Sequence, residues 1–308
     1  MAITAAMVKD LREMTGAGMM DCKKALTETD GDMDKAVEFL REKGLAAAEK
    51  KAGRIAAEGI CATTVSEDGK TAAIVEVNSE TDFVAKNDTF RTYVSAVAVQ
   101  AAKTAAADID AFLAEPWMLD TGKSVKEELS TQISIIGENM NIRRFEKVVA
   151  ENGFVESYIH GGGRIGVLVK MESAVYNDAA REAAKNVAMQ IAAIYPKYVN
   201  RSEISEEYIE HEREILKAQA MNENTGKPEN IIDKMIIGRL NKELKEICLV
   251  DQAYVKDADL TVQQYLDNVS KELGTKISVK SFVRYETGEG LAKKEENFAE
   301  EVAKQMGQ

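Results

Sequence analysis

The first 45 residues carry apolar side chains at helical spacing in three short runs. The first run, Thr4 to Met14, predicts an amphipathic helix capped by Thr4. A second helix follows Gly18, and a third begins after Asp32 and ends at Gly44, because glycine is favoured just beyond a helix. Residues 1–45 therefore predict a three-helix bundle whose core is of marginal size.

The apolar period changes from helical to alternating after an Ala- and Lys-rich segment, residues 46–58, which we interpret as a partly helical linker. Strands are predicted at Cys61 to Val65 and Ala72 to Val77, joined by the hairpin turn Asp68-Gly69. The Ala- and Val-rich run Thr89 to Ala107 has few charges and predicts a helix packed on a sheet. Residues 59–143 form the first predicted subdomain of the core.

The same order of elements recurs further along the chain. Strands are predicted at Arg144 to Val149, Val155 to His160 and Arg164 to Met171, and an Ala-rich helix at Asp178 to Ile194. A hairpin followed by a helix thus occurs twice, from which we infer two related α+β subdomains. The second comprises residues 144–202 with 250–290, since Ile277 to Tyr285 alternates as one more strand.

Two charged helices, Ile204 to Asn222 and Glu229 to Ile247, flank the turn Gly226-Lys227-Pro228. Their apolar seams are narrow and their polar faces wide, which favours an antiparallel hairpin at residues 203–249 that projects from the core. Two ordinary core helices are the alternative. Residues 291–308 predict a last amphipathic helix with Phe298, Val302 and Met306 on one face. The expected fold class is α+β with antiparallel sheets.

Composition narrows the range of functions. The net charge is -12, from 40 Lys plus Arg and 52 Asp plus Glu, which argues against direct nucleic-acid binding. No apolar run approaches the roughly 18 residues of a membrane span, and the charged N-terminus does not resemble a signal peptide. The three cysteines form no CxxC or CxxH pair, so we expect no zinc site and a reducing, cytoplasmic setting.

The chain carries two partial phosphate-binding motifs and no recognisable catalytic set. Residues 69–71 and 122–124 resemble the end of a P-loop, but the leading glycine is replaced by Thr64 and Trp117. With two histidines in the chain, acid–base chemistry near neutral pH is restricted. We therefore expect no bound nucleotide, cofactor or metal, and a binding protein rather than an enzyme. A carboxylate-based metal hydrolase is disfavoured because no compact ligand set exists.

Two segments have both a structural and a functional interpretation. Residues 78–87 leave a strand and place Phe83 where a loop meets a helix start. Either Thr81 or Asp82 caps that helix and Phe83 packs on the sheet, or an acidic side chain lies beside an exposed aromatic wedge. The glycines at 161–163, beside His160, form either a hairpin turn or a cradle for an anion.

Five motifs together resemble the bacterial translation elongation factor Ts family, in the right order and over essentially the whole chain. They are TGAGMMDCKKAL at 15–26, TDFVAK at 81–86, GENMNIRR at 137–144, His160 with RIGV at 164–167, and FVRYE with GEG between 282 and 290. Related sequences can carry a shorter glycine turn after His160, which leaves the geometry of that turn open.

The resemblance implies a non-enzymatic guanine nucleotide exchange factor for elongation factor Tu, with a ubiquitin-associated-like N-terminal domain. It assigns displacement of the partner's Mg²⁺ to Thr81, Asp82, Phe83 and Val84. It assigns partner contacts to Leu11, Met19, Met20, Asp82, Phe83, His160, Phe298 and Val302. The hairpin becomes a coiled-coil or dimerisation module, which leaves a homodimer or a 2:2 complex open. A passive scaffold that binds without altering nucleotide release is the alternative.

The free energy that nucleotide release requires favours several points of contact with the partner. Shifting a nucleotide site about 10⁴-fold requires roughly 5.5 kcal/mol of differential binding. Burying one Phe side chain contributes only about 1.5–3 kcal/mol. A wedge at Phe83 is therefore insufficient alone, and the N-terminal bundle, the core and the last helix must all contribute.

Overall fold

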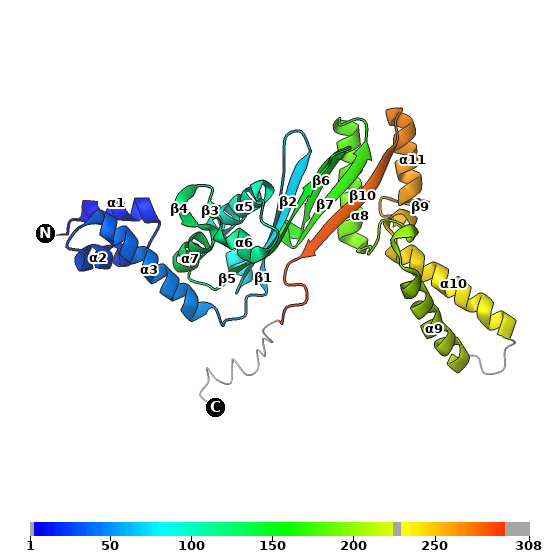
Figure 1. Ribbon diagram of the computed structural model, residues 1–308, viewed down its shortest axis with the longest axis horizontal. Coiled ribbons are helices and arrows are strands. Elements are labelled where there is room, and N and C mark those ends of the chain that lie inside the picture. The colour runs from blue at the N-terminus through cyan, green and yellow to red at the C-terminus, as the bar shows by residue number, and fades with distance from the viewer. Residues whose placement is uncertain (1–2, 224–228, 293–308) are drawn as a thin grey trace.

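The computed structural model describes residues 3–223 and 229–292, and shows an elongated α+β protein. The N-terminal helices lie at one end, a helical hairpin lies at the other, and two sheets lie between them (Figure 1). The predicted C-terminal helix at 291–308, with Phe298, Val302 and Met306, falls outside the described residues apart from its first two positions.

Three helices form the N-terminal bundle: α1 (Ala5–Thr15), α2 (Met19–Glu28) and α3 (Met33–Lys51). Thr4 and Asp32 cap α1 and α3 through side-chain oxygens, as expected. The prediction that the third helix ends at Gly44 is wrong, because α3 continues to Lys51. The following Leu-Ala-Ala-Ala run consists of strong helix formers, and Gly44 faces the backbone of Ser130 at a helix–helix contact.

The first half of the core holds a three-stranded antiparallel sheet in the order β1-β2-β5. Its strands are β1 (Glu58–Val65), β2 (Thr71–Ser79) and β5 (Met140–Val149). The intervening elements are α4 (Asp82–Ala85), α5 (Asp88–Lys103), α6 (Ile109–Ala114), β3 (Pro116–Trp117), β4 (Asp120–Ser124) and α7 (Val125–Ile136).

The second half holds a sheet in the order β10-β7-β6, also antiparallel. Its strands are β6 (Phe154–His160), β7 (Ile165–Ser173) and β10 (Ile277–Glu286). Its other regular elements are η1 (Gly161–Gly163), α8 (Asp178–Ile194), η2 (Arg201–Glu203), η3 (Leu249–Asp251), β8 (Ala253–Tyr254), β9 (Asp257–Thr261) and α11 (Val262–Leu273).

The strand predicted at Arg144 to Val149 exists, but its assignment to the second subdomain is wrong. It belongs to β5, which pairs with β2 so that Arg144 lies opposite Glu76. Met140 and Ile142 of β5 are buried in the core beneath α5. Local alternation predicts a strand but not its neighbour, and the boundary placed between residues 143 and 144 therefore cuts through β5.

The two halves repeat each other in more detail than the sequence analysis predicted. Helices α7 and α11 both begin with a capping box, Ser124 with Glu127 and Thr261 with Gln264. Gln100 of α5 accepts a hydrogen bond from the backbone N–H of Met118, and Gln190 of α8 accepts one from Val255. Both glutamines also donate to the first residue of the following small ribbon. Shared buried contacts of this kind confirm the inferred duplication.

The core has four layers, helices on both outer faces and two sheets between them (Figure 1). One face of the first sheet packs on α5, α6 and α7, and one face of the second packs on α8 and α11. The inner faces meet through Cys61, Ile74, Val155 and Leu168. A Cβ at Gly166 would lie 3.0 Å from Cys61 and Ile74 side-chain atoms, so a small residue there permits the close approach.

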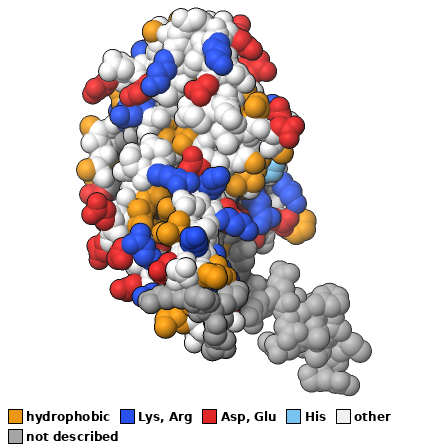
Figure 2. Space-filling view, turned by 90° about the vertical axis from the view of Figure 1, so that its right-hand side faces the viewer, with side chains coloured by type: hydrophobic (Ala, Val, Ile, Leu, Met, Phe, Trp, Pro, Cys, Tyr) orange, Lys and Arg blue, Asp and Glu red, His pale blue; other side chains and the backbone are white. Residues whose placement is uncertain are grey.

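Helices α9 (Glu206–Glu223) and α10 (Glu229–Ile247) form the hairpin, and both match the predicted segments. Their seam is separate from the other cores and includes Leu216, Ile236, Leu240 and Leu244. Figure 2 views this end of the molecule and shows basic side chains across its middle, acidic ones along its edges and hydrophobic ones between. No helix of the part described combines the length and hydrophobicity of a membrane span.

Candidate functional site

The short helix α4 turns its four side chains in two directions. Thr81 caps it by accepting a hydrogen bond from the N–H of Val84 (3.3 Å). Val84 and Ala85 lie against the core of the first half. Phe83 is 80% exposed, so the interpretation in which it packs on the sheet is wrong. Thr81 as N-cap is confirmed, and the cap leaves the aromatic ring in solvent.

Asp82 lies beside Phe83 on the exposed face of α4. Its carboxylate binds Lys86 Nζ at 2.6 Å, one helical turn away. The hydrogen bond from Lys86 lowers the pKa of Asp82 below its ordinary value, so the carboxylate is ionised at neutral pH. An acidic group and an exposed aromatic ring therefore lie side by side.

The loop between α7 and β5 clamps the entrance to α4. Glu138 accepts hydrogen bonds from the N–H groups of Glu80 (3.1 Å) and Thr81 (3.0 Å) and from Thr81 Oγ1 (2.7 Å). In return, Glu80 accepts one from the N–H of Asn139 (2.6 Å). Sequence reasoning assigned no role to Glu138, although it lies in the GENMNIRR motif. The clamp holds α4 in place from outside its own segment.

The duplication provides an internal comparison for α4. In the first half, residues 80–86 separate β2 from Asn87, the N-cap of α5. In the second half, only residues 174–176 separate β7 from Asn177, the N-cap of α8. The difference of four residues equals the length of α4. A strand-to-helix connection in this fold does not require the turn that carries Asp82 and Phe83.

A groove of about 490 Å³ extends from α4 to the glycine turn after β6. Its lining includes Asp82, Lys86, Arg91, Gly162 and Arg164. Arg91 of α5 donates hydrogen bonds to the carbonyl of Ala85 (3.3 Å) and to that of Gly162. One arginine, which sequence reasoning missed, thus joins two segments that come from different halves of the core.

His160 ends β6 and is exposed beside this groove. Its Nδ1 lies 3.0 Å from the hydroxyl of Tyr158. The three glycines that follow all have positive φ, and a Cβ at Gly163 would lie 2.7 Å from Ile60. The turn is therefore a compact 3-10 turn pressed against β1, which fits the hairpin-turn interpretation better than an open anion cradle.

The N-terminal residues named from the resemblance have two different environments. Met19 and Met20, at the start of α2, are 59% and 74% exposed. Leu11 is fully buried in the core of the bundle, so its side chain is not accessible for the expected direct contact with a partner in this structure. Its apolar side chain packs α1 against α2 instead. Phe298 and Val302 lie outside the described residues.

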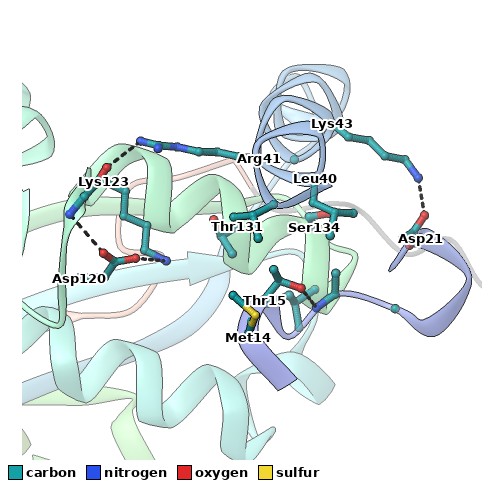
Figure 3. Close-up of a pocket in the computed structure, with 16 residues that line it drawn as sticks. Met14, Thr15, Asp21, Leu40, Arg41, Lys43, Asp120, Lys123, Thr131 and Ser134 are labelled. Carbon is teal, nitrogen blue, oxygen red and sulfur yellow. Dashed lines mark hydrogen bonds and ion pairs between the residues drawn. The ribbon is translucent and has the colours of Figure 1, made fainter. Parts of the chain in front are cut away.

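A cavity of about 310 Å³ lies where the bundle meets the core. Figure 3 shows Met14 and Leu40 beside Thr131 and Ser134 of α7. The charged side chains around it are paired within the chain: Lys43 with Asp21, Arg41 with Glu127 at 2.6 Å, and Lys123 with Asp120 at 3.5 Å. We interpret it as a loosely packed joint.

The described residues hold no obvious chemical centre. No three His, Cys, Asp or Glu side chains of residues 3–223 and 229–292 gather as a metal site would require. The second partial P-loop serves structure, since Ser124 caps α7 and Lys123 pairs with Glu128. What the surface offers is an exposed aromatic ring, an ionised carboxylate and a groove, which suits binding to another protein.

Comparisons with known proteins place the chain among close relatives. A family model described as Elongation factor TS matches residues 80–289. A protein named Elongation factor Ts from Clostridium novyi (strain NT) is 56% identical over 306 residues, with 99% of each chain covered. Proteins of the same name from Clostridium perfringens (strain SM101 / Type A) and Clostridium tetani (strain Massachusetts / E88) are 56% and 55% identical, again over 99% of each chain.

Proposed function

Because the chain belongs to the elongation factor Ts family of translation elongation factors, we propose that it binds elongation factor Tu in its GDP-bound form and accelerates GDP release. It acts by binding and catalyses no covalent step. The observation that carries the proposal is Phe83, exposed on a four-residue turn that the duplicated connection lacks.

The chemistry of the turn suits a site that depends on Mg²⁺. A GTPase holds the GDP phosphates through backbone amides and an Mg²⁺ ion whose ligands are oxygen atoms. Phe83 would insert into an apolar gap of the partner, and ionised Asp82 would compete for groups that order the Mg²⁺ shell. The Glu138 clamp supports this role because it fixes the turn before the partner arrives.

Other surfaces must contribute to the binding free energy, since burying Phe83 supplies only about 1.5–3 kcal/mol. Met19 and Met20 form an exposed apolar pair on the N-terminal bundle, and Arg164 lines the groove from the second half, with exposed His160 next to the lining residue Gly161. We assign these to contact with the partner, together with Phe298 and Val302 beyond the described residues. Coupling between sites is reciprocal, so bound nucleotide must in turn weaken the complex.

The hairpin suits association with a second copy of the chain. Ile215, Met221, Ile231 and Ile237 are exposed along it, outside its own seam. A homodimer, or a 2:2 complex with the partner, would cover them. The proposed setting is the cytoplasm.

Stopped-flow release of a fluorescent GDP analogue from elongation factor Tu tests the proposal. The intact protein should accelerate release in a saturable way. A variant lacking residues 82–85, with a connection as short as that before α8, should fold and bind but release slowly. If the intact protein binds the partner without changing the release rate, the passive scaffold is the correct alternative.

A further inference from the structure

Glu76 of β2 is fully buried, and within its own strand its carboxylate accepts a hydrogen bond from Asn78 Nδ2 (3.0 Å). It accepts hydrogen bonds from Arg143 Nη1 (3.0 Å), Arg144 Nε (2.6 Å) and the N–H of Gly288 (2.8 Å). A buried carboxylate is costly unless it is paired and hydrogen-bonded. Two arginines, the Asn78 side-chain amide and one backbone amide meet that requirement here.

A β-bulge explains how two consecutive arginines reach one carboxylate. Neighbouring residues of a strand normally point to opposite faces of the sheet. Glu76 lies opposite Arg144 and Val77 opposite Ile142, so Arg143 is the extra residue of the bulge. The bulge thus brings both guanidinium groups to Glu76.

Both arginines also hold the turn that follows β10, through their Nη2 atoms. Arg143 Nη2 donates to the carbonyl of Glu289 (2.6 Å), and Arg144 Nη2 donates to that of Glu286 (3.3 Å). Gly288 has φ +74, and a Cβ there would lie 2.2 Å from the carbonyl oxygen of Ala57. The turn at 286–290, from the second half, is therefore wedged between Glu76 and Ala57 of the first.

The duplicated half shows that this cluster is not needed to build the fold. The same bulge occurs in β10, where Lys280 is the extra residue opposite the β7 positions Lys170 and Met171. Lys280 binds Glu172 at the surface, 3.5 Å away and about half exposed. The second sheet therefore makes the bulge with no buried carboxylate at that point, so the bulge alone does not account for the arginine cluster of the first sheet.

The turn also forms part of the candidate site. Thr287 and Ala57 both line the groove that contains Asp82 and Arg164. The hydroxyl of Thr287 donates to the carbonyl of Gly163 (3.1 Å), in the turn after His160. Displacing the 286–290 turn would therefore change the wall of the groove and its link to the His160 side.

We propose that Glu76 is a positioning residue for nucleotide exchange: with Arg143 and Arg144 it locks the 286–290 turn between the two halves and so sets the groove that receives the partner. This inference rests on the proposed function and names a residue, buried and remote from contact with the partner, through which that function depends on the joint between the halves.

Two variants disturb the contact between Glu76 and the 286–290 turn, one on the first half of the core and one on the second. Glu76→Gln keeps the size of the side chain but removes its charge, and Gly288→Ala places a Cβ against Ala57 while leaving Glu76 intact. The matched controls are Glu156→Gln, another buried acid paired with an arginine, and Gly274→Ala, which also has positive φ but lies at the end of α11, outside the turn, with open space around its Cβ.

Two measurements report whether the 286–290 turn stays fixed between the two halves. The first is the maximal rate and half-saturating concentration for GDP release. Both test variants should lower the maximal rate about tenfold or more, since a hydrogen bond to a charged group is worth such a factor. The half-saturating concentration should change little, because the N-terminal contacts remain. The second is an electron paramagnetic resonance distance between labels at Ser95 and Lys185, exposed on α5 and α8, which should broaden in both variants.

The controls should behave as the intact protein in both measurements. If Glu76→Gln does not fold, Gly288→Ala alone decides. Wild-type rates and an unbroadened distance in the test variants overturn the inference. A rate loss of equal size in the controls also overturns it, since general destabilisation then explains the effect. If the intact protein does not accelerate release, the proposed function fails instead, and the distance measurement still tests the lock.

Discussion

At the scale of single residues, α4 divides its side chains between holding the turn and presenting it. Val84 and Ala85 face the core, Thr81 caps the turn, and Asp82 with Phe83 faces solvent. Truncating an inward side chain would cost stability, whereas truncating an outward one should leave the fold intact. The residue that matters for a partner can thus be separated from those that hold the turn.

Phe83→Ala should slow partner-stimulated GDP release by about 10- to 100-fold, the factor that corresponds to burying one Phe side chain. Its thermal midpoint should stay within about 2 °C of the intact protein, because Phe83 makes no core contact. Leu119→Ala, an exposed apolar residue of the same half, serves as the control. A large fall in the midpoint with a normal rate per folded molecule would return Phe83 to a structural role.

Asp82→Asn should slow release when Mg²⁺ is present, and the defect should shrink when Mg²⁺ is chelated, because chelation replaces the proposed action of the carboxylate. Lys86→Ala breaks the ion pair but keeps the charge of Asp82, and should release GDP nearly as fast as the intact protein. The GDP release rates of the intact protein, Asp82→Asn and Lys86→Ala, each measured with and without chelator, test this prediction. If the defect of Asp82→Asn does not depend on Mg²⁺, the proposed Mg²⁺ displacement by Asp82 is wrong and only the insertion of Phe83 remains.

At the scale of elements, apolar periodicity and apolar runs predicted the strands of both sheets and the long helices. Helices α8 and α10 have the predicted bounds, because their apolar stripes are long. Helices α7 and α11 were missed, although the sequence of each capping box, Ser124 with Glu127 and Thr261 with Gln264, was readable. The pairing of β5 with β2 depends on contacts distant in sequence, which no local pattern carries.

The candidate site was predictable in its location but not in its orientation. A cap at Thr81 is compatible with Phe83 pointing either way, so local sequence could not decide. Comparing the spacing before Asn87 with that before Asn177 would have revealed the extra turn, since both asparagines cap the helix that follows a central strand. Arg91 and Glu76 act across the joint between the halves, and only the assembled fold reveals them.

The helical hairpin should be dispensable for the core. The chain enters and leaves it at one point, where the N–H of Leu249 donates to the carbonyl of Tyr198 (2.9 Å) and Arg201 binds Asp251 at 2.6 Å. Replacing residues 206–246 by a short Gly/Ser linker should therefore keep the cooperative melting transition of the core and most of the exchange activity. Calorimetry checks the first and stopped-flow the second; loss of cooperative melting would make these helices part of the core.

At the scale of the whole molecule, the N-terminal bundle reaches the core mainly through α3 on α7. Arg41 pairs with Glu127, and Lys51 Nζ lies 3.5 Å from the carbonyl oxygen of Ile133. The bundle has its own core, and the cavity beside Met14 and Leu40 leaves the joint incompletely packed. The bundle and the remainder should therefore unfold independently of each other.

Removing residues 1–52, a cut placed after α3 rather than at Gly44, should leave the core folded and weaken partner binding by about tenfold or more, as expected when an apolar contact pair is lost. Titration calorimetry with elongation factor Tu measures the loss. Replacing Met19 and Met20 by Ala in the full chain should reproduce most of it. Unchanged affinity in the truncated protein would show that the bundle does not dock on the partner.

The strand orders have a consequence for the course of synthesis on the ribosome. The first sheet is complete once β5 has emerged at residue 149, whereas the second must wait for β10, which begins at residue 277 and pairs with β7 only after the whole hairpin has been made. Domains generally fold as units during synthesis, the N-terminal one first. During that interval Glu76 and its two arginines lack the 286–290 turn, which is the last part of the cluster to be made. The nascent chain therefore acquires its Phe83 turn early and a finished groove only as translation of its own message ends.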